Sequence, residues 1–123
     1  MDPAQSEADP ENVYKERMII MPQAIPSYIA RDPYWKPVIH LFQKNAKLNT
    51  LFNTKYFDME HGLIDSAALK KSASKWSQSE KFLLNLAIHL YTNDGKLDLC
   101  NMDYLDDYNK KLVMEAITLR FFR

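Results

Sequence analysis

The chain has 123 residues, and its 16 lysines and arginines balance 16 aspartates and glutamates. A chain of this length normally forms one domain. The neutral balance argues against a protein built for bulk binding to nucleic acid or to an anionic membrane. Hydrophobic residues make up 46% of the chain and charged residues 26%, which excludes a disordered or fibrous protein.

Glycine and cysteine are scarce. The two glycines, Gly62 and Gly95, leave little room for phosphate-binding loops or for the turns of an all-β fold, so composition predicts an all-α protein. Cys100 is the single cysteine, so no intrachain disulfide is expected. The chain does not begin with a basic segment followed by an apolar run, and its longest apolar stretch, residues 82–91, is too short to cross a bilayer. We therefore expect a cytoplasmic protein with no membrane contact.

The first 37 residues divide into two segments. Residues 1–17 are acidic and poor in large apolar side chains, which predicts a flexible tail. Residues 18–37 combine four prolines with many large apolar residues, which predicts an extended arm. Two packings of this arm remain open: it crosses its own helical body, or it docks on a partner. Exchange of the arm between two copies would give a homodimer.

Residues 38–123 are expected to form the helical body, and residues 18–123 together a single domain. The apolar spacing predicts a small compact bundle of about four to six helices. Asp32 and Pro33 are a typical N-cap and first helical residue, although the helix could also begin at Lys36. Ser77 and Glu80 have the spacing of a capping box and predict a helix that reaches residue 92.

Three aspartates are expected to begin further helices. Asp65 precedes a helix that runs to about residue 75, Asp98 a short turn, and Asp106 the last helix. Gly95 is expected to provide the left-handed residue that ends the helix of residues 78–92. Because each glycine lies two residues before an aliphatic residue, Ile64 and Leu97 are expected to pair as a short β-bridge.

The arm supplies the candidate partner-binding surface. Its aromatic and aliphatic side chains are of the types found at protein interfaces, and a proline-interrupted segment cannot bury them as one long helix. The surface comprises Ile25, Tyr28, Ile29, Tyr34 and Trp35. We therefore expect a non-catalytic interaction or regulatory module that binds another protein or itself.

The alternative function is nucleic-acid binding. Lys70, Lys71 and Lys75 lie close to Trp76, and such a basic helix face could contact phosphates. Against this alternative, arginine, which reads bases most often, occurs only four times in the chain.

No motif for catalysis, metal binding or cofactor binding was recognised. His40, His61 and His89 have no metal-ligand spacing, and the loops around the two glycines lack the first and last ligands of a calcium loop. Cys100 is expected to be a buried, inert thiol. We therefore expect no enzyme activity, no cofactor and no metal.

Overall fold

The computed structural model describes residues 25–122, and the predicted tail and residues 18–24 of the predicted arm lie outside this range. The described residues are mostly helical, which confirms the predicted class, and a two-stranded hairpin is added to the helices. In chain order the elements are α2 (Ser27–Ala30), α3 (Trp35–Lys44), α4 (Ala46–Asn49), β1 (Phe57–Asp58), β2 (Leu63–Ile64), α5 (Ser66–Ser72), α6 (Gln78–Thr92), the 3-10 helix η1 (Leu99–Tyr104) and α7 (Asp107–Phe121).

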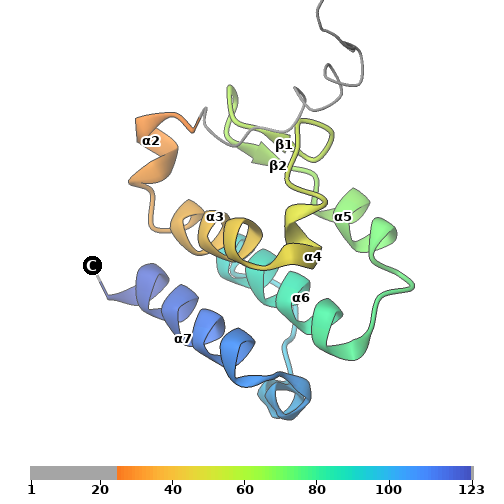
Figure 1. Ribbon diagram of the computed structural model, residues 1–123. Helices are drawn as coiled ribbons and strands as arrows, with labels where there is room; N and C mark the ends of the chain where they lie inside the picture. The colour runs from red at the N-terminus through yellow and green to blue at the C-terminus, as the bar shows by residue number, and fades with distance from the viewer. Residues whose placement is uncertain (1–24, 123) are drawn as a thin grey trace, which may run out of the picture.

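Helix α3 lies at the centre of the molecule, between α7 on one side and α6 on the other (Figure 1). The hairpin and α2 lie at one end, and α7 forms an edge of the molecule. Buried side chains from α3, α6 and α7 join aromatic residues of the hairpin region in one continuous core. Phe42, Phe52 and Phe57 pack edge-on or tilted at ring distances of 5.0–6.0 Å.

The predicted helix starts are confirmed at the atomic level. Ser77 and Glu80 form the complete capping box of α6. The Asp106 carboxylate accepts a hydrogen bond of 2.8 Å from the Asn109 amide at the start of α7, and Asp65 caps α5 in the same way. These signals are local, because the cap and the amide that it satisfies are three residues apart.

The prediction of an extended arm is wrong for residues 25–37. The chain instead forms α2 and the first turn of α3, because none of its described prolines lies where a helical amide is needed. Pro26 is the N-cap of α2, Pro33 lies in the turn before α3, and Pro37 lies in the first turn of α3. Asp32 accepts hydrogen bonds from the amides of Tyr34 at 2.7 Å and Trp35 at 3.4 Å, but the N-cap of α3 is Tyr34 and the helix begins at Trp35, between the two predicted starts at Pro33 and Lys36.

Two loop predictions are also wrong. Ile64 pairs with Phe57 in an antiparallel hairpin and not with Leu97. The nearby pairing closes a short loop, whereas a bridge to Leu97 would close a much longer one at a higher entropic cost. Gly95 is left-handed as predicted, with φ of 82°, but the residue that ends α6 is Asn93, with φ of 62°, a conformation that asparagine tolerates better than most residues.

None of the helices formed by residues 25–122 combines the length and the apolar character that a bilayer crossing requires.

Candidate interaction surface

The five predicted partner-binding residues do not form one surface. Ile29 is fully buried and Trp35 is 4% exposed, so neither is accessible to a partner in this structure. Trp35 packs edge-on against Tyr91 at a ring distance of 5.3 Å. Tyr28 and Tyr34 are 51% and 37% exposed, and Ile25 is half-buried. The apolar residues of this segment therefore divide between the core and the surface.

The exposed tyrosines line an open recess of about 500 Å³ between α2, α3, the hairpin loop and α6. The Tyr91 hydroxyl donates a hydrogen bond of 2.9 Å to the Gly62 carbonyl at the edge of this recess. Burial, with a smaller contribution from the charge of Asp32, raises the pKa of Tyr91. The hydrogen bond to Gly62 holds the hairpin against α6. The recess is lined by Tyr28, Asp32, Tyr34, Trp35, Gly62 and Tyr91.

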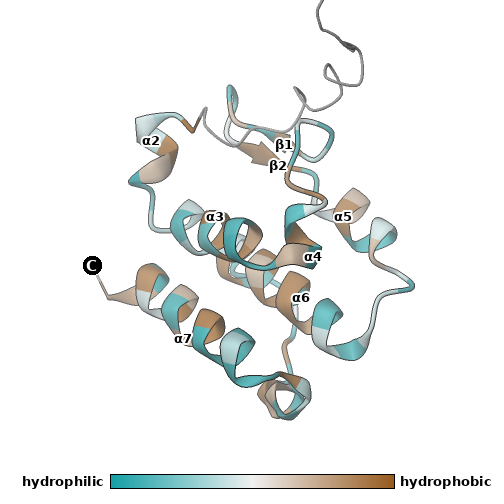
Figure 2. Cartoon of the chain, in the orientation of Figure 1, coloured by the Kyte–Doolittle hydropathy of each residue, from teal (hydrophilic) through white to brown (hydrophobic). Residues whose placement is uncertain are grey.

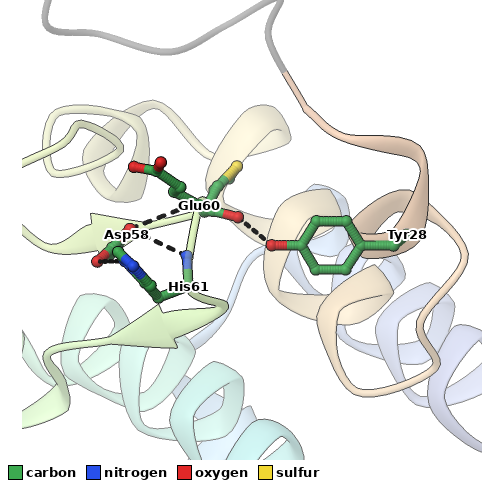
Figure 3. A network of polar contacts seen from close by, with 5 residues as sticks. Tyr28, Asp58, Glu60 and His61 are labelled. Carbon is green, nitrogen blue, oxygen red and sulfur yellow. Dashed lines mark hydrogen bonds and ion pairs between the residues drawn. The ribbon is translucent and has the colours of Figure 1, made fainter.

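The loop between β1 and β2 is held by hydrogen bonds from within and from α2 (Figure 3). The Asp58 carboxylate accepts hydrogen bonds from the amides of Glu60 at 3.1 Å and His61 at 3.2 Å, and its second oxygen lies 2.8 Å from His61 Nδ1. From outside the loop, the Tyr28 hydroxyl donates to the Met59 carbonyl. The loop is thus an ordered turn anchored on α2.

The charges in this loop stabilise one another. The hydrogen bond from His61 lowers the pKa of Asp58, and the same contact raises the pKa of His61. Both side chains are exposed, so solvent screens the pair and its effect on folding is small.

Asp58, Glu60 and His61 also offer one oxygen or nitrogen ligand each, and the three ligand atoms lie within 4.8 Å of one another. The set is chemically suited to a divalent cation. Its spacing in the sequence matches neither a zinc motif nor a calcium loop, so it becomes evident only in the folded hairpin. The hydrogen bonds inside the turn account for this geometry without a cation, and all three side chains are exposed.

Arg120 connects Tyr34 to the C-terminal end of α6. The Arg120 guanidinium lies 3.9 Å from the centre of the Tyr34 ring and is 6% exposed. Its Nε donates to the Leu90 carbonyl at 3.1 Å, and its Nη2 donates to Asn93 Oδ1 at 3.0 Å. A buried cation at the C-terminal end of α6 is stabilised by the partial negative charge there. Arg120 therefore ties α6, α7 and Tyr34 together.

The three lysines of the alternative hypothesis are exposed. Lys70 and Lys71 lie in the last turn of α5, where positive charge is favourable, and Lys75 follows in the loop before α6. The neighbouring Trp76 is half-buried, and Lys47 Nζ lies 5.4 Å from the centre of its ring. The lysines are therefore available to an anion, whereas the tryptophan ring is already partly covered.

Helix α7 carries an exposed apolar surface that the sequence analysis did not single out. Met114 and Phe121 are each 56% exposed, Tyr108 is 55% exposed, and Phe122, just after the helix, is 75% exposed. Hydrophobic segments are visible on successive turns of α7 at the edge of the molecule (Figure 2). Tyr108 lies toward α3, because its hydroxyl donates a hydrogen bond of 2.8 Å to the Lys44 carbonyl. Lys111, Met114, Thr118 and Phe121 follow one another at intervals of three or four residues, so they lie along one side of the helix. We call this side the outer face of α7: Lys111, Met114, Thr118, Phe121 and the adjoining Phe122.

A groove of about 480 Å³ runs beside this face, between α3 and α7. His40 of α3 and Glu115 of α7 join across it, with 2.8 Å between Nε2 and Oε1. A second hollow of about 400 Å³ shares His40 and Leu119 with the first and extends toward Ile25. The outer face of α7 is thus bordered by a continuous depression.

The other residues considered for chemistry have structural surroundings. His89 Nδ1 lies 2.7 Å from the Asp94 carbonyl oxygen, in the turn that ends α6. Cys100 is exposed, contrary to the expected burial, because η1 has no buried side chain. Its amide donates to the Asp98 carboxylate at 2.9 Å, so Asp98 caps η1 as predicted.

Comparison of the chain with protein-family models, with curated proteins and with solved structures finds no match.

Proposed function

We propose that this protein is a non-catalytic interaction module and that the outer face of α7 binds another protein chain. The observation that carries this proposal is the exposure of Met114 and Phe121 on one side of α7, with the exposed Phe122 directly after the helix. Large apolar side chains gathered on one surface are typical of interaction sites, and methionine and aromatic residues are enriched in interface cores.

The packing of α7 supports this proposal. Leu112, Val113 and Ala116 face α3 and the core and are buried, so the core already accounts for one apolar side of the helix. A helix at the edge of a molecule normally presents polar residues on its other side. Helix α7 presents Met114 and Phe121 there, and a protein partner would remove them from water.

A test requires one variant that alters this face and one that alters an equally exposed residue elsewhere. Met114→Glu places a charge at the middle of the face. Leu63→Glu is the matched control, because Leu63 is 60% exposed and lies on the hairpin. Both variants should show the circular dichroism spectrum and the thermal unfolding of the parent protein.

The tagged proteins are then used to isolate partners from the native lysate, with and without nuclease. We expect a stoichiometric protein that survives nuclease, is retained by Leu63→Glu and is lost with Met114→Glu. Equal binding by the two variants, or no bound protein at all, would refute the proposal.

The second candidate function is nucleic-acid binding through Lys70, Lys71 and Lys75. The exposure of all three side chains supports it. It predicts that nuclease abolishes all binding, that affinity for DNA or RNA falls steeply with salt, and that replacing the three lysines by glutamine removes this binding. Binding that is unaffected by these replacements would exclude it.

A further inference from the structure

The recess of about 500 Å³ beside the hairpin has aromatic walls and an acidic residue at its edge. Its lining comprises Tyr28, Asp32, Tyr34, Trp35, Gly62 and Tyr91. Of the described residues that line it, Asp32 is the only charged one. Aromatic rings carry negative potential on their faces, so the rings and the carboxylate together favour a cation. The Arg120 guanidinium already lies 3.9 Å from the centre of the Tyr34 ring, which leaves Tyr34 less available to a second cation than the other rings are.

The hairpin loop holds two of the aromatic walls in place. The Tyr28 hydroxyl donates to the Met59 carbonyl, so this ring reaches from α2 to the loop (Figure 3). The Tyr91 hydroxyl donates to the Gly62 carbonyl at 2.9 Å. Trp35 is nearly perpendicular to Tyr91, with an interplanar angle of 72° and a ring distance of 5.3 Å. Because these contacts already order the walls, a ligand would lose little affinity in ordering them.

Asp32 provides the negative charge of the recess. Its Oδ1 accepts a hydrogen bond of 2.7 Å from the Tyr34 amide, which fixes the carboxylate. Within residues 25–122, Oδ2 accepts no hydrogen bond and no cationic side chain forms an ion pair with Asp32. Burial raises the pKa of Tyr91 and the charge of Asp32 adds to this rise, so the field of the carboxylate reaches the opposite wall.

This combination is better suited to a cation without N–H groups than to lysine or arginine. A primary ammonium group carries three donors and is strongly hydrated, whereas the recess offers it one carboxylate. A guanidinium group pairs best with both oxygens of a carboxylate, and Oδ1 of Asp32 is already engaged. A trimethylammonium group has no donor to satisfy, and its diffuse charge is attracted by aromatic faces.

The openness of the recess indicates how such a group would be presented. Tyr28 and Tyr34 are 51% and 37% exposed. Sites for free small molecules normally enclose most of the ligand, which so open a recess does not do. It suits the end of a long side chain whose remainder stays outside. A trimethylated lysine has this form, with a cationic end on an apolar stem that can lie along an exposed ring.

We propose that this recess binds the trimethylammonium group of a methylated lysine on a partner protein, with Tyr28, Trp35 and Tyr91 as aromatic walls and Asp32 as the opposite charge. The outer face of α7 contributes no residue to the recess. The two sites are therefore tested independently, and the failure of one leaves the other standing.

The first experiment is an NMR titration of the ¹⁵N-labelled full chain with a short blocked glycine peptide that carries a central trimethyl-lysine. The indole N–H of Trp35 and the amide of Gly62 should shift, and the indole of Trp76 should not. We expect a dissociation constant in the millimolar range, about tenfold tighter than for the same peptide with unmodified lysine or with arginine. No shift at the recess, or equal binding of either unmethylated peptide, would overturn the proposal.

A pair of charge variants tests the carboxylate. Asp32→Asn removes the charge and retains an oxygen that can accept from the Tyr34 amide, so it should weaken binding of the trimethyl-lysine peptide about fivefold or more. Asp103→Asn makes the same change of net charge at an exposed position in η1 and should have no effect. Equal effects of the two variants would assign the binding to net charge and refute the site.

Three tyrosine variants test the wall. Tyr28→Leu removes the ring and should weaken binding about threefold or more, whereas Tyr104→Leu removes a ring of η1 that is 59% exposed and should not weaken it. Tyr28→Phe loses only the hydrogen bond to the loop and should bind nearly as well as the parent protein. If Tyr28→Leu binds as the parent does, or if Tyr28→Phe weakens binding as much as Tyr28→Leu, the ring is not a wall of the site and the proposal is wrong.

Tetramethylammonium chloride tests the source of the cation, with sodium chloride at equal concentration as the control. It should shift the same signals with a lower affinity than the trimethyl-lysine peptide, because it lacks the apolar stem. Binding as tight as that of the peptide would assign the recess to a free small cation and overturn the assignment to lysine.

Discussion

Replacing Arg120 by leucine tests the structural role of the buried guanidinium. Leucine retains apolar packing on Tyr34 and removes the charge together with the hydrogen bonds to the Leu90 carbonyl and the Asn93 side chain. A hydrogen bond to a charged group contributes roughly 1.5–3 kcal/mol, and we take about 1.5 for each because Asn93 is exposed. The cation–π contact adds about 1 kcal/mol.

The desolvation of the guanidinium opposes these contributions. Removal of a buried charge recovers on the order of 1–2 kcal/mol, so the expected net loss in the free energy of unfolding is about 2–3 kcal/mol. For a folded region of this size, that loss lowers the Tm by about 10 °C. The assay is urea denaturation followed by circular dichroism, with Tm measured in parallel.

Arg31→Leu is the matched control, because Arg31 is exposed at the end of α2. Its effect should remain within about 0.5 kcal/mol. If Arg120→Leu is as stable as the parent protein, or more stable, then the guanidinium does not hold α6 and α7 together and the reasoning is refuted.

Three further predictions concern the core, the hairpin loop and the start of α6. Trp35→Ala should lower the free energy of unfolding by about 3–5 kcal/mol, measured by urea denaturation, because a buried ring is lost. A loss below about 1 kcal/mol would contradict the burial of Trp35 in the core. Asp58→Asn should lower the pKa of His61 in an NMR titration. The contact raises the pKa of His61 and lowers that of Asp58, so its small stabilisation of the folded state is present at pH values between these two pKa values. It is lost as the pH rises through the folded-state pKa of His61 or falls through that of Asp58. An unchanged His61 titration in Asp58→Asn would exclude the ion pair. Ser77→Ala should cost about 1 kcal/mol in thermal unfolding through loss of the capping box, whereas Ser74→Ala, in the exposed turn before it, should be nearly neutral, and equal effects would contradict the assignment.

The features that the sequence predicted correctly are local. Ser77 with Glu80, Asp65 and Asp106 each begin a helix, because cap and amide lie a few residues apart in the chain. The mostly helical class followed from the scarcity of glycine and from apolar spacing.

The errors concern contacts between distant segments. Trp35 is buried because Tyr91 and Phe57 pack against it, and neither partner is close to it in the chain. Ile64 could pair with the nearby Phe57 or with the distant Leu97, and the sequence pattern does not indicate which of these two partners it takes.

The outer face of α7 was overlooked for a related reason. Apolar side chains between residues 107 and 122 lie around much of the circumference of α7. The sequence indicates their spacing but does not indicate which side of the helix faces α3. Tyr108 and Phe121 belong to the same apolar spacing as the buried Leu112 and Ala116, whereas both are more than half exposed. Only the packing of Leu112, Val113 and Ala116 on the core identifies the side that remains for a partner.

The central claim is that the outer face of α7 contacts protein, and site-specific photo-cross-linking tests it most directly. A benzophenone amino acid replaces Met114 in one protein and Leu63 in a second, and both are irradiated in the cells that naturally produce the chain. The account predicts a discrete protein adduct from position 114, with the mass of a dimer if the partner is a second copy, and none from position 63. The absence of any adduct at 114, or the same adducts from both positions, would contradict it.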